Sequence, residues 1–221
     1  MKREPLKWGA PARRVPVCGR PGGLRLGFTL ARGMKVGLFG GSFNPAHDGH
    51  QHVAATALQR LGLDRLIWLV SPQNPLKSSK DTMSLEGRMA SAQRFVGRRE
   101  IISDAEQRLG VVYTLDTLRI LKARYPGVRF VWIMGSDNLA GFHRWRGWTD
   151  VLRLAPIAVV SRPGALLQSR LGPAARRFPH GRLPSRQAPL LPGAKAPAWM
   201  FLRGPLNTMS STAIRAARTR V

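Results

Sequence analysis

The residues with the clearest chemical potential lie between Gly40 and His50. His47 and His50 are three positions apart where helical apolar spacing begins, so both imidazoles fall on one face of a first helical turn. A breaker-rich turn at residues 40–45 precedes them and follows an apolar run at 35–39. Such a turn lets the backbone approach a ligand, and the unpaired amides and positive dipole end of the next helix favour an anion. This order of strand, turn and helix is typical of a phosphate site.

The same stretch has other interpretations. A glycine-rich turn is often a plain connection, and this one matches neither G-x-G-x-x-G nor a Walker A loop. Ser42 lacks the full G-x-S-x-G pattern of a nucleophile elbow, which makes it a poor nucleophile. Asp48 and His52 lie near the two histidines in sequence, but no cysteine or carboxylate cluster completes a metal shell. A structural zinc site is therefore the weaker alternative, and no residue is assigned as a metal ligand.

Further apolar runs predict the sheet that positions this turn. Runs at Arg65–Val70, 128–134, Ile157–Val160 and Trp199–Leu202 are typical of strands buried on both faces of a parallel sheet, with a short extended piece at Glu100–Ser103. Helices are expected to begin at Ser84 and at Thr114, which we interpret as N-caps. The proline-rich segment 164–197 is predicted to be a long surface loop or a weakly ordered helix-loop excursion. Strand, helix and strand within about 35 residues form a right-handed βαβ unit, so the chain is of the α/β class.

Composition bounds the class of protein. The chain has 221 residues, 43% of them hydrophobic, which is enough for one substantial core and a single domain. Its net charge of +25 suits a nucleic acid or a polyanionic small substrate, but it equally fits an arginine-rich composition. Cys18 is the single cysteine, which excludes an internal disulfide and favours a reducing, cytoplasmic location.

The first 33 residues differ from the rest. They carry eight basic residues, one acidic residue and four prolines without a regular period, so we expect residues 1–33 to be a disordered basic tail and residues 34–221 to form the domain. Translation starting at Met34 is an alternative, and an arm that binds nucleic acid is another. There is no secretory h-region and no apolar run long enough to span a membrane.

Four blocks in order resemble one family. GGSFNPAHDGH, which ends at His50, is similar to the signature of nucleotidyltransferases, and its Asn44-Pro45 variant resembles bacterial nicotinate-nucleotide adenylyltransferases. PQNPLK with Lys77, GSDN followed by Phe142 and Trp145, and MSSTAIR with Arg215 resemble further blocks of that family. The resemblance spans roughly residues 34–218. It implies a Rossmann-like doubly wound parallel sheet of about five or six strands, with reacting groups over the carboxyl ends of the strands.

The resemblance also implies the roles of individual residues. His47, His50 and Arg215 would be catalytic. Lys77, Thr114 and Trp145 would bind the acceptor, with the Trp145 indole stacked on the nicotinate ring. ATP and its phosphates would meet Gly40, Gly41, Ser42, Phe43, Gly135, Asp137, Ser210, Ser211 and Thr212.

The implied reaction is adenylyl transfer from ATP to nicotinate mononucleotide, with Mg²⁺ held mainly by ATP phosphates and water. A sister transferase that uses nicotinamide mononucleotide or phosphopantetheine stays open, as does a non-catalytic basic protein that binds RNA. Nucleic acid is the less favoured partner, and no membrane partner is expected. The sequence leaves the oligomeric state open, a homo-oligomer included.

Overall fold

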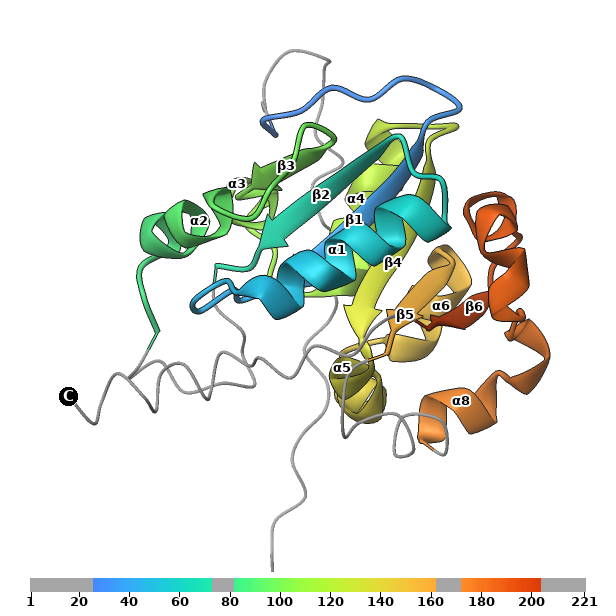
Figure 1. The fold of residues 1–221 in the computed structure, drawn as a ribbon. Helices are drawn as coiled ribbons and strands as arrows, with labels where there is room; N and C mark the ends of the chain where they lie inside the picture. Colours follow the sequence, from blue (N-terminus) through green and yellow to red (C-terminus); the bar gives the residue numbers. More distant parts are fainter. Residues whose placement is uncertain (1–25, 73–81, 162–171, 204–221) are drawn as a thin grey trace, which may run out of the picture.

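A six-stranded sheet forms the centre of the protein, which is seen in a computed structural model that describes residues 26–72, 82–161 and 172–203 (Figure 1). The strand order is β3-β2-β1-β4-β5-β6, and every pairing is parallel. The strands are β1 (Lys35–Gly41), β2 (Arg65–Val70), β3 (Glu100–Ser103), β4 (Arg129–Gly135), β5 (Ile157–Val160) and β6 (Trp199–Leu202). The predicted Rossmann-like, doubly wound parallel sheet is therefore confirmed, and four predicted strands have the predicted bounds.

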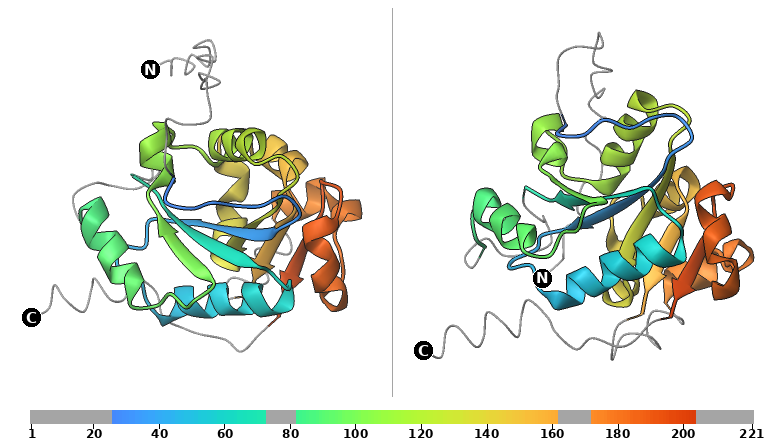
Figure 2. Two further views of the ribbon diagram at one scale, coloured as in Figure 1. Left: turned by 90° about the horizontal axis from the view of Figure 1, so that it is seen from above. Right: turned by 45° about the horizontal axis from the view of Figure 1, so that its top comes forward.

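Helices cover both faces of this sheet (Figures 1 and 2). One face packs against α1 (Asp48–Arg60), α2 (Leu85–Gln93) and the 3-10 segment η3 (Ser185–Gly193). The other face packs against α3 (Ala105–Leu109), α4 (Thr114–Arg124), α5 (Ser136–Gly141), η1 (Phe142–Arg144), α6 (Trp148–Leu154) and α8 (Pro173–Arg177). A short 3-10 turn, η2 (Pro179–Gly181), links α8 to η3. Of the helices in these three described ranges, none has the length and apolar character needed to cross a membrane.

Strand side chains alternate between the two cores, because successive residues of a strand point to opposite faces. Leu38 of β1 and Trp132 of β4 belong to the core under α4, whereas Phe39 and Ile133 belong to the core under α1. Both faces are buried, which explains why the strands read as nearly continuous apolar runs.

The prediction of a disordered tail through residue 33 is wrong for residues 26–33. Leu26 is 1% exposed and Leu30 is 8% exposed, and both belong to the core under α4. The Leu26 carbonyl accepts a 2.8 Å hydrogen bond from the Ser103 hydroxyl, and the Phe28 carbonyl accepts one of 3.2 Å from the Tyr125 hydroxyl. We call residues 26–33 the strap. Leu26, Phe28 and Leu30 alternate along the strap, but three apolar residues next to a proline-rich basic segment are too few to identify an ordered element from the sequence. Residues 1–25 lie outside the described ranges.

Several local expectations also change. β1 continues through Gly41, so the first two glycines of the expected turn belong to the strand. The N-cap of α4 is Tyr113, and Thr114 is the first helical residue, because Tyr113 keeps an extended backbone. Ser84 does cap α2, where its hydroxyl accepts a 3.1 Å hydrogen bond from the Gly87 amide.

The expected surface loop after β5 is, in its described part, a set of short helical turns. Ala188 and Leu191 in η3 are buried against the core under α1, so this segment covers the sheet edge beside β6. The 3-10 conformation and the internal prolines Pro189 and Pro192 remove the 3.6-residue period by which a helix is recognised in a sequence.

Candidate active site

The predicted functional residues of the described ranges gather at the carboxyl ends of the strands. β1 pairs with β2 on one side and with β4 on the other, so the chain reverses its winding direction between β1 and β4. Gly41 ends β1 and Gly135 ends β4, while Asp137 is exposed in the first turn of α5. In open α/β sheets this reversal is where ligands bind.

His47 and His50 close the start of α1 with a reciprocal pair of hydrogen bonds. His47 is the N-cap, and its Nδ1 accepts from the Gly49 amide at 3.1 Å. His50 Nδ1 accepts from the His47 amide at 3.3 Å. This is a capping box built from two imidazoles, whose ring centroids lie 3.9 Å apart. The two rings therefore lie side by side, as the spacing predicted.

The capping box changes how this helix start can meet an anion. The amides of His47 and Gly49 were expected to be unpaired, yet each donates to an imidazole nitrogen. A neutral imidazole that accepts at Nδ1 carries its proton on Nε2. Each ring thus accepts one backbone N–H of the helix start at Nδ1 and carries its own N–H on the other ring nitrogen, Nε2. The donors that the two rings retain are therefore their Nε2–H groups, and the His47 side chain is buried.

Phe43 holds the turn between β1 and α1 in shape. Its φ of 46° lies in the left-handed region, which is uncommon for a side chain of this size. Phe43 is 1% exposed, and its ring centroid lies 5.0 Å from both the His50 ring and the Trp68 ring. This packing offsets part of the backbone strain. In this structure Phe43 therefore supports His50 from within the core.

The glycines of β1 have internal reasons for their small size. A Cβ at Gly40 would lie 2.6 Å from the Trp132 ring, and a Cβ at Gly41 would lie 3.0 Å from the Phe43 ring. These glycines were predicted to let the backbone approach a ligand. The structure shows that the Trp132 ring leaves no room for a Cβ at position 40, whereas the Phe43 ring makes a Cβ at position 41 a tight fit.

Helix α2 is fastened to the turn by residues that the sequence analysis did not single out. The Arg88 guanidinium is 1% exposed and donates to four carbonyls: Ser42 at 2.9 Å, Ser71 at 2.6 Å, Pro72 at 2.8 Å and Met83 at 3.1 Å. The Asn44 side chain accepts from the Met83 amide at 3.1 Å, and the Ser91 hydroxyl accepts from the Ala46 amide at 3.1 Å. The available signal was an arginine at position 88, within the apolar face of a predicted helix.

A second buried charged group lies beside the same strand end. Burial raises the pKa of the Glu106 carboxyl, and hydrogen bonds from Thr117 and Ser71 offset this only in part. The Thr117 hydroxyl donates to Glu106 Oε1 at 2.9 Å. The Ser71 amide donates to the Gly41 carbonyl at 3.0 Å, so the exit of β2 is tied to β1, to Arg88 and to Glu106.

Thr114 and Trp145 come from neighbouring segments. Arg146 lies over the Tyr113 ring at 4.7 Å, and Gly147 packs so closely on Leu115 that a Cβ would approach it to 2.5 Å. The first turn of α4 and the segment after η1 are therefore in contact. The Trp145 ring is half-buried and meets Phe142 edge to face at 5.2 Å, so it is partly a core residue. Stacking on nicotinate stays a prediction.

Several predicted site residues cannot be placed. Lys77, Ser210, Ser211, Thr212 and Arg215 lie outside the described residues. Among the residues of the described ranges, no three His, Cys, Asp or Glu side chains are grouped to hold a metal ion.

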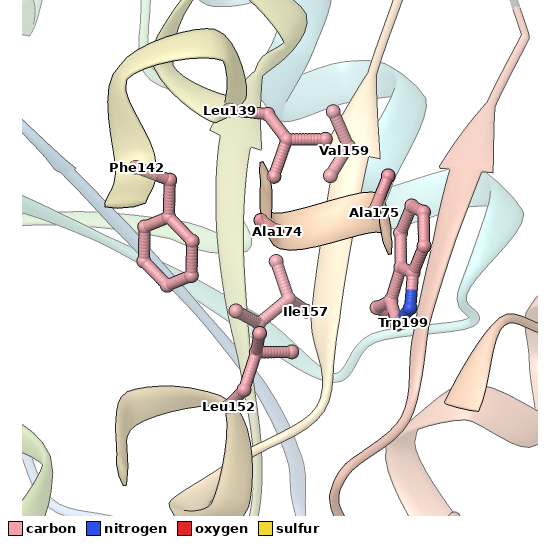
Figure 3. A pocket seen from close by; sticks show the side chains of 8 residues that line it. All are labelled: Leu139, Phe142, Leu152, Ile157, Val159, Ala174, Ala175 and Trp199. Carbon is pink, nitrogen blue, oxygen red and sulfur yellow. The ribbon is translucent and has the colours of Figure 1, made fainter. Parts of the chain in front are cut away.

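A small pocket lies apart from the histidines, between α5, η1, α6, α8 and the last two strands (Figure 3). It is lined by Leu139, Phe142, Leu152, Ile157, Val159, Ala174, Ala175 and Trp199. The lone polar side-chain atom of this lining, Trp199 Nε1, already donates to the Phe178 carbonyl at 2.7 Å. This apolar pocket therefore has no group suited to a phosphate.

Comparisons with known proteins agree on one family. Residues 38–217 match the Cytidylyltransferase-like family. A protein from Caulobacter sp. (strain K31), named probable nicotinate-nucleotide adenylyltransferase, is 64% identical over 188 residues, covering 85% of this chain and 100% of the relative. A protein of the same name from Roseobacter denitrificans (strain ATCC 33942 / OCh 114) is 51% identical over 194 residues, covering 87% of this chain and 97% of its own.

Solved structures resemble this fold at low sequence identity. Plasmodium falciparum nicotinic acid mononucleotide adenylyltransferase complexed with NaAD superposes with a TM-score of 0.60 at 15% identity, covering 82% of both chains. The same enzyme complexed with APC gives a TM-score of 0.59 at 14% identity, covering 83% of both chains. These two likenesses bear on the fold alone.

Proposed function

The chain belongs to the nicotinate-nucleotide adenylyltransferase family, and we propose that it transfers the adenylyl group of ATP to nicotinate mononucleotide. An oxygen of the mononucleotide phosphate attacks the α-phosphorus of ATP in line. The bond from that phosphorus to the β-phosphate oxygen breaks, giving deamido-NAD and pyrophosphate. No protein nucleophile is needed, which fits the poor nucleophile context of Ser42.

The observation that carries this proposal is the imidazole pair at the point where the sheet reverses direction. Negative charge develops on the α-phosphate and on the leaving pyrophosphate as the reaction proceeds. Preorganised N–H donors aimed at developing charge lower the barrier without reorganising at the moment of reaction. The Nε2–H groups of His47 and His50 are such donors, because their Nδ1 atoms are fixed by backbone amides.

The remaining contacts to ATP are part of the proposal. Gly40, Gly41, Ser42 and Phe43 bring the backbone of the β1 exit close to the phosphates. Asp137 accepts from ribose hydroxyls beside the β4 exit, and the segment from Ser210 to Arg215 supplies hydroxyls and a cation for the triphosphate. Lys77, Thr114 and Trp145 form the acceptor side.

Mg²⁺ enters with ATP as part of the substrate complex. Imidazole, amide and guanidinium groups dominate the described site and are poor ligands for a hard cation, whereas phosphate oxygens and water are good ones. The ion would neutralise part of the phosphate charge. We further propose a cytoplasmic enzyme, in keeping with its single cysteine.

The test is pyrophosphate release from ATP and Mg²⁺ with each acceptor in turn. Nicotinate mononucleotide should give the highest kcat/KM, above nicotinamide mononucleotide, and phosphopantetheine should give none. Preference for either of the other two acceptors would refute the assignment. No turnover together with salt-dependent RNA binding would favour the RNA-binding alternative.

A further inference from the structure

Arg88 links three segments that meet next to residues 42–47, which we call the histidine turn. Its four carbonyl acceptors belong to Ser42 in the turn, to Ser71 and Pro72 at the exit of β2, and to Met83 just before α2. A guanidinium presents five N–H donors in a fixed planar fork, so one side chain can hold all three segments in one geometry.

Two further bonds join the same helix to the same turn. The Asn44 side chain accepts from the Met83 amide, and the Ser91 hydroxyl accepts from the Ala46 amide. Together with Arg88 and Ser42, these contacts fasten alternate residues of the turn, positions 42, 44 and 46. His47 follows directly, so the position of its ring depends on a turn that is held at three points by α2 and by Met83 just before it.

The burial of Arg88 is costly for a protein that needs only packing at this place. An arginine in the interior loses its hydration and must be fully hydrogen-bonded, whereas an apolar side chain of similar volume carries no such cost. Within the three described ranges no carboxylate lies close enough to form an ion pair with it. Its N–H groups donate instead to carbonyls of the connecting segments, and these hydrogen bonds fix the segments relative to one another.

We propose that Arg88 is a positioning residue for adenylyl transfer, which holds the histidine turn and the exit of β2 in the relative arrangement that the in-line reaction needs. This inference rests on the proposed function. Arg88 acts through His47 and His50. It contacts neither substrate in this scheme, so its loss should fall on kcat more than on the KM of the acceptor.

The experiment compares three variants of the full chain at a temperature well below the lowest Tm. Arg88→Met removes the donors, and Arg88→Lys keeps the charge but not the fork. Leu26→Ala lowers stability from the core on the opposite face of the sheet, which contains no residue of the turn. We expect kcat to fall about tenfold to a hundredfold in Arg88→Met and at least about tenfold in Arg88→Lys, the scale for misplacing catalytic groups by about 1 Å. Leu26→Ala should keep kcat within about twofold, even where its Tm loss is as large, because it disturbs no contact of the turn.

Several outcomes overturn the proposal. A Lys variant with kcat within about twofold of wild type would show that charge alone suffices. An equal kcat loss in Leu26→Ala would show a general effect of stability. If Arg88→Met does not fold, Ser91→Ala is the deciding variant, because it removes one hydrogen bond between α2 and the histidine turn. A kcat loss of about threefold or more supports the proposal. A smaller loss overturns the proposal. Wild-type turnover in the same assay keeps these outcomes separate from failure of the proposed function, which would show as no turnover in any variant.

Discussion

Leu26→Ala should lower the stability of the protein by several kcal/mol, although Leu26 precedes the first strand of the sheet. The side chain is 1% exposed and lies in the core under α4. Truncation to alanine removes three buried carbons, worth about 0.8 kcal/mol each, and leaves a cavity, so the total should be about 2 to 5 kcal/mol. For a domain of this length each kcal/mol shifts Tm by about 2 to 4 °C, and a loss near 3 kcal/mol corresponds to about 6 to 12 °C.

The measurement is urea unfolding followed by circular dichroism and tryptophan fluorescence, with a thermal melt alongside. Because the Leu26 backbone carbonyl still accepts from Ser103, the strap itself should stay in place and the m-value should not change. Leu190→Ala is the matched control: that leucine is 64% exposed, so its loss should cost less than about 0.5 kcal/mol. A Leu26→Ala protein that melts within about 1 °C of wild type would refute the packing of the strap.

The same reasoning reverses the expectation for a chain that starts at Met34. If residues 1–33 were a disordered tail, as the sequence predicted, a chain that starts at Met34 would be as stable and as active as the full protein. It would lack both buried strap leucines and would expose the core surface that they cover. We now expect a lower Tm and greater binding of a hydrophobic dye; equal melting of the two proteins would restore the original expectation.

Three further changes test the site. His50→Ala should lower kcat about a hundredfold to a thousandfold, with about 1 kcal/mol lost from the helix cap, while His52→Ala on the same helix should leave kcat unchanged; equal losses would remove the special role of His50. Trp145→Ala should raise the acceptor KM about tenfold while the ATP KM stays within about twofold, and Trp145→Phe should recover most of this; a joint rise of both KM values with a lower Tm would make Trp145 a core residue. Glu106 has a raised pKa in the folded state, so its contribution to stability is complete below the ordinary glutamate pKa of 4.5 and is lost as pH rises through the folded pKa. Glu106→Gln should therefore flatten the fall of unfolding free energy as pH rises above 4.5, and an unchanged pH profile would contradict the buried carboxyl.

The sheet could be predicted because its strands carry a strong signal. Arg65–Val70 and Trp199–Leu202 are continuous apolar runs bounded by turn residues, and burial on both faces requires such runs. The helices α3, α5 and α6 have five to seven residues, too few to establish a helical period, and they went unrecognised.

The site was predicted less completely, because its supports are interactions between distant segments. The spacing of His47 and His50 placed the rings side by side, but it did not show that the rings would accept hydrogen bonds from the Gly49 and His47 amides. Three of the four Arg88 contacts join positions 16 to 46 residues apart, and the Ser103 contact to the strap spans 77 residues. Such distances carry no periodic signal, and only the folded chain reveals them.

The contact between Gly40 and Trp132 also constrains how the protein can change over evolutionary time. The indole of Trp132, on the neighbouring strand β4, fills the space beside Gly40. The side chains at positions 40 and 132 must therefore fit together into one fixed volume. Alanine at position 40 becomes acceptable only after position 132 has become smaller, whereas the reverse order passes through an overpacked intermediate. The order of mutations then matters as much as their identity: a lineage that retains Trp132 also retains Gly40, whether or not any ligand needs the bare backbone there.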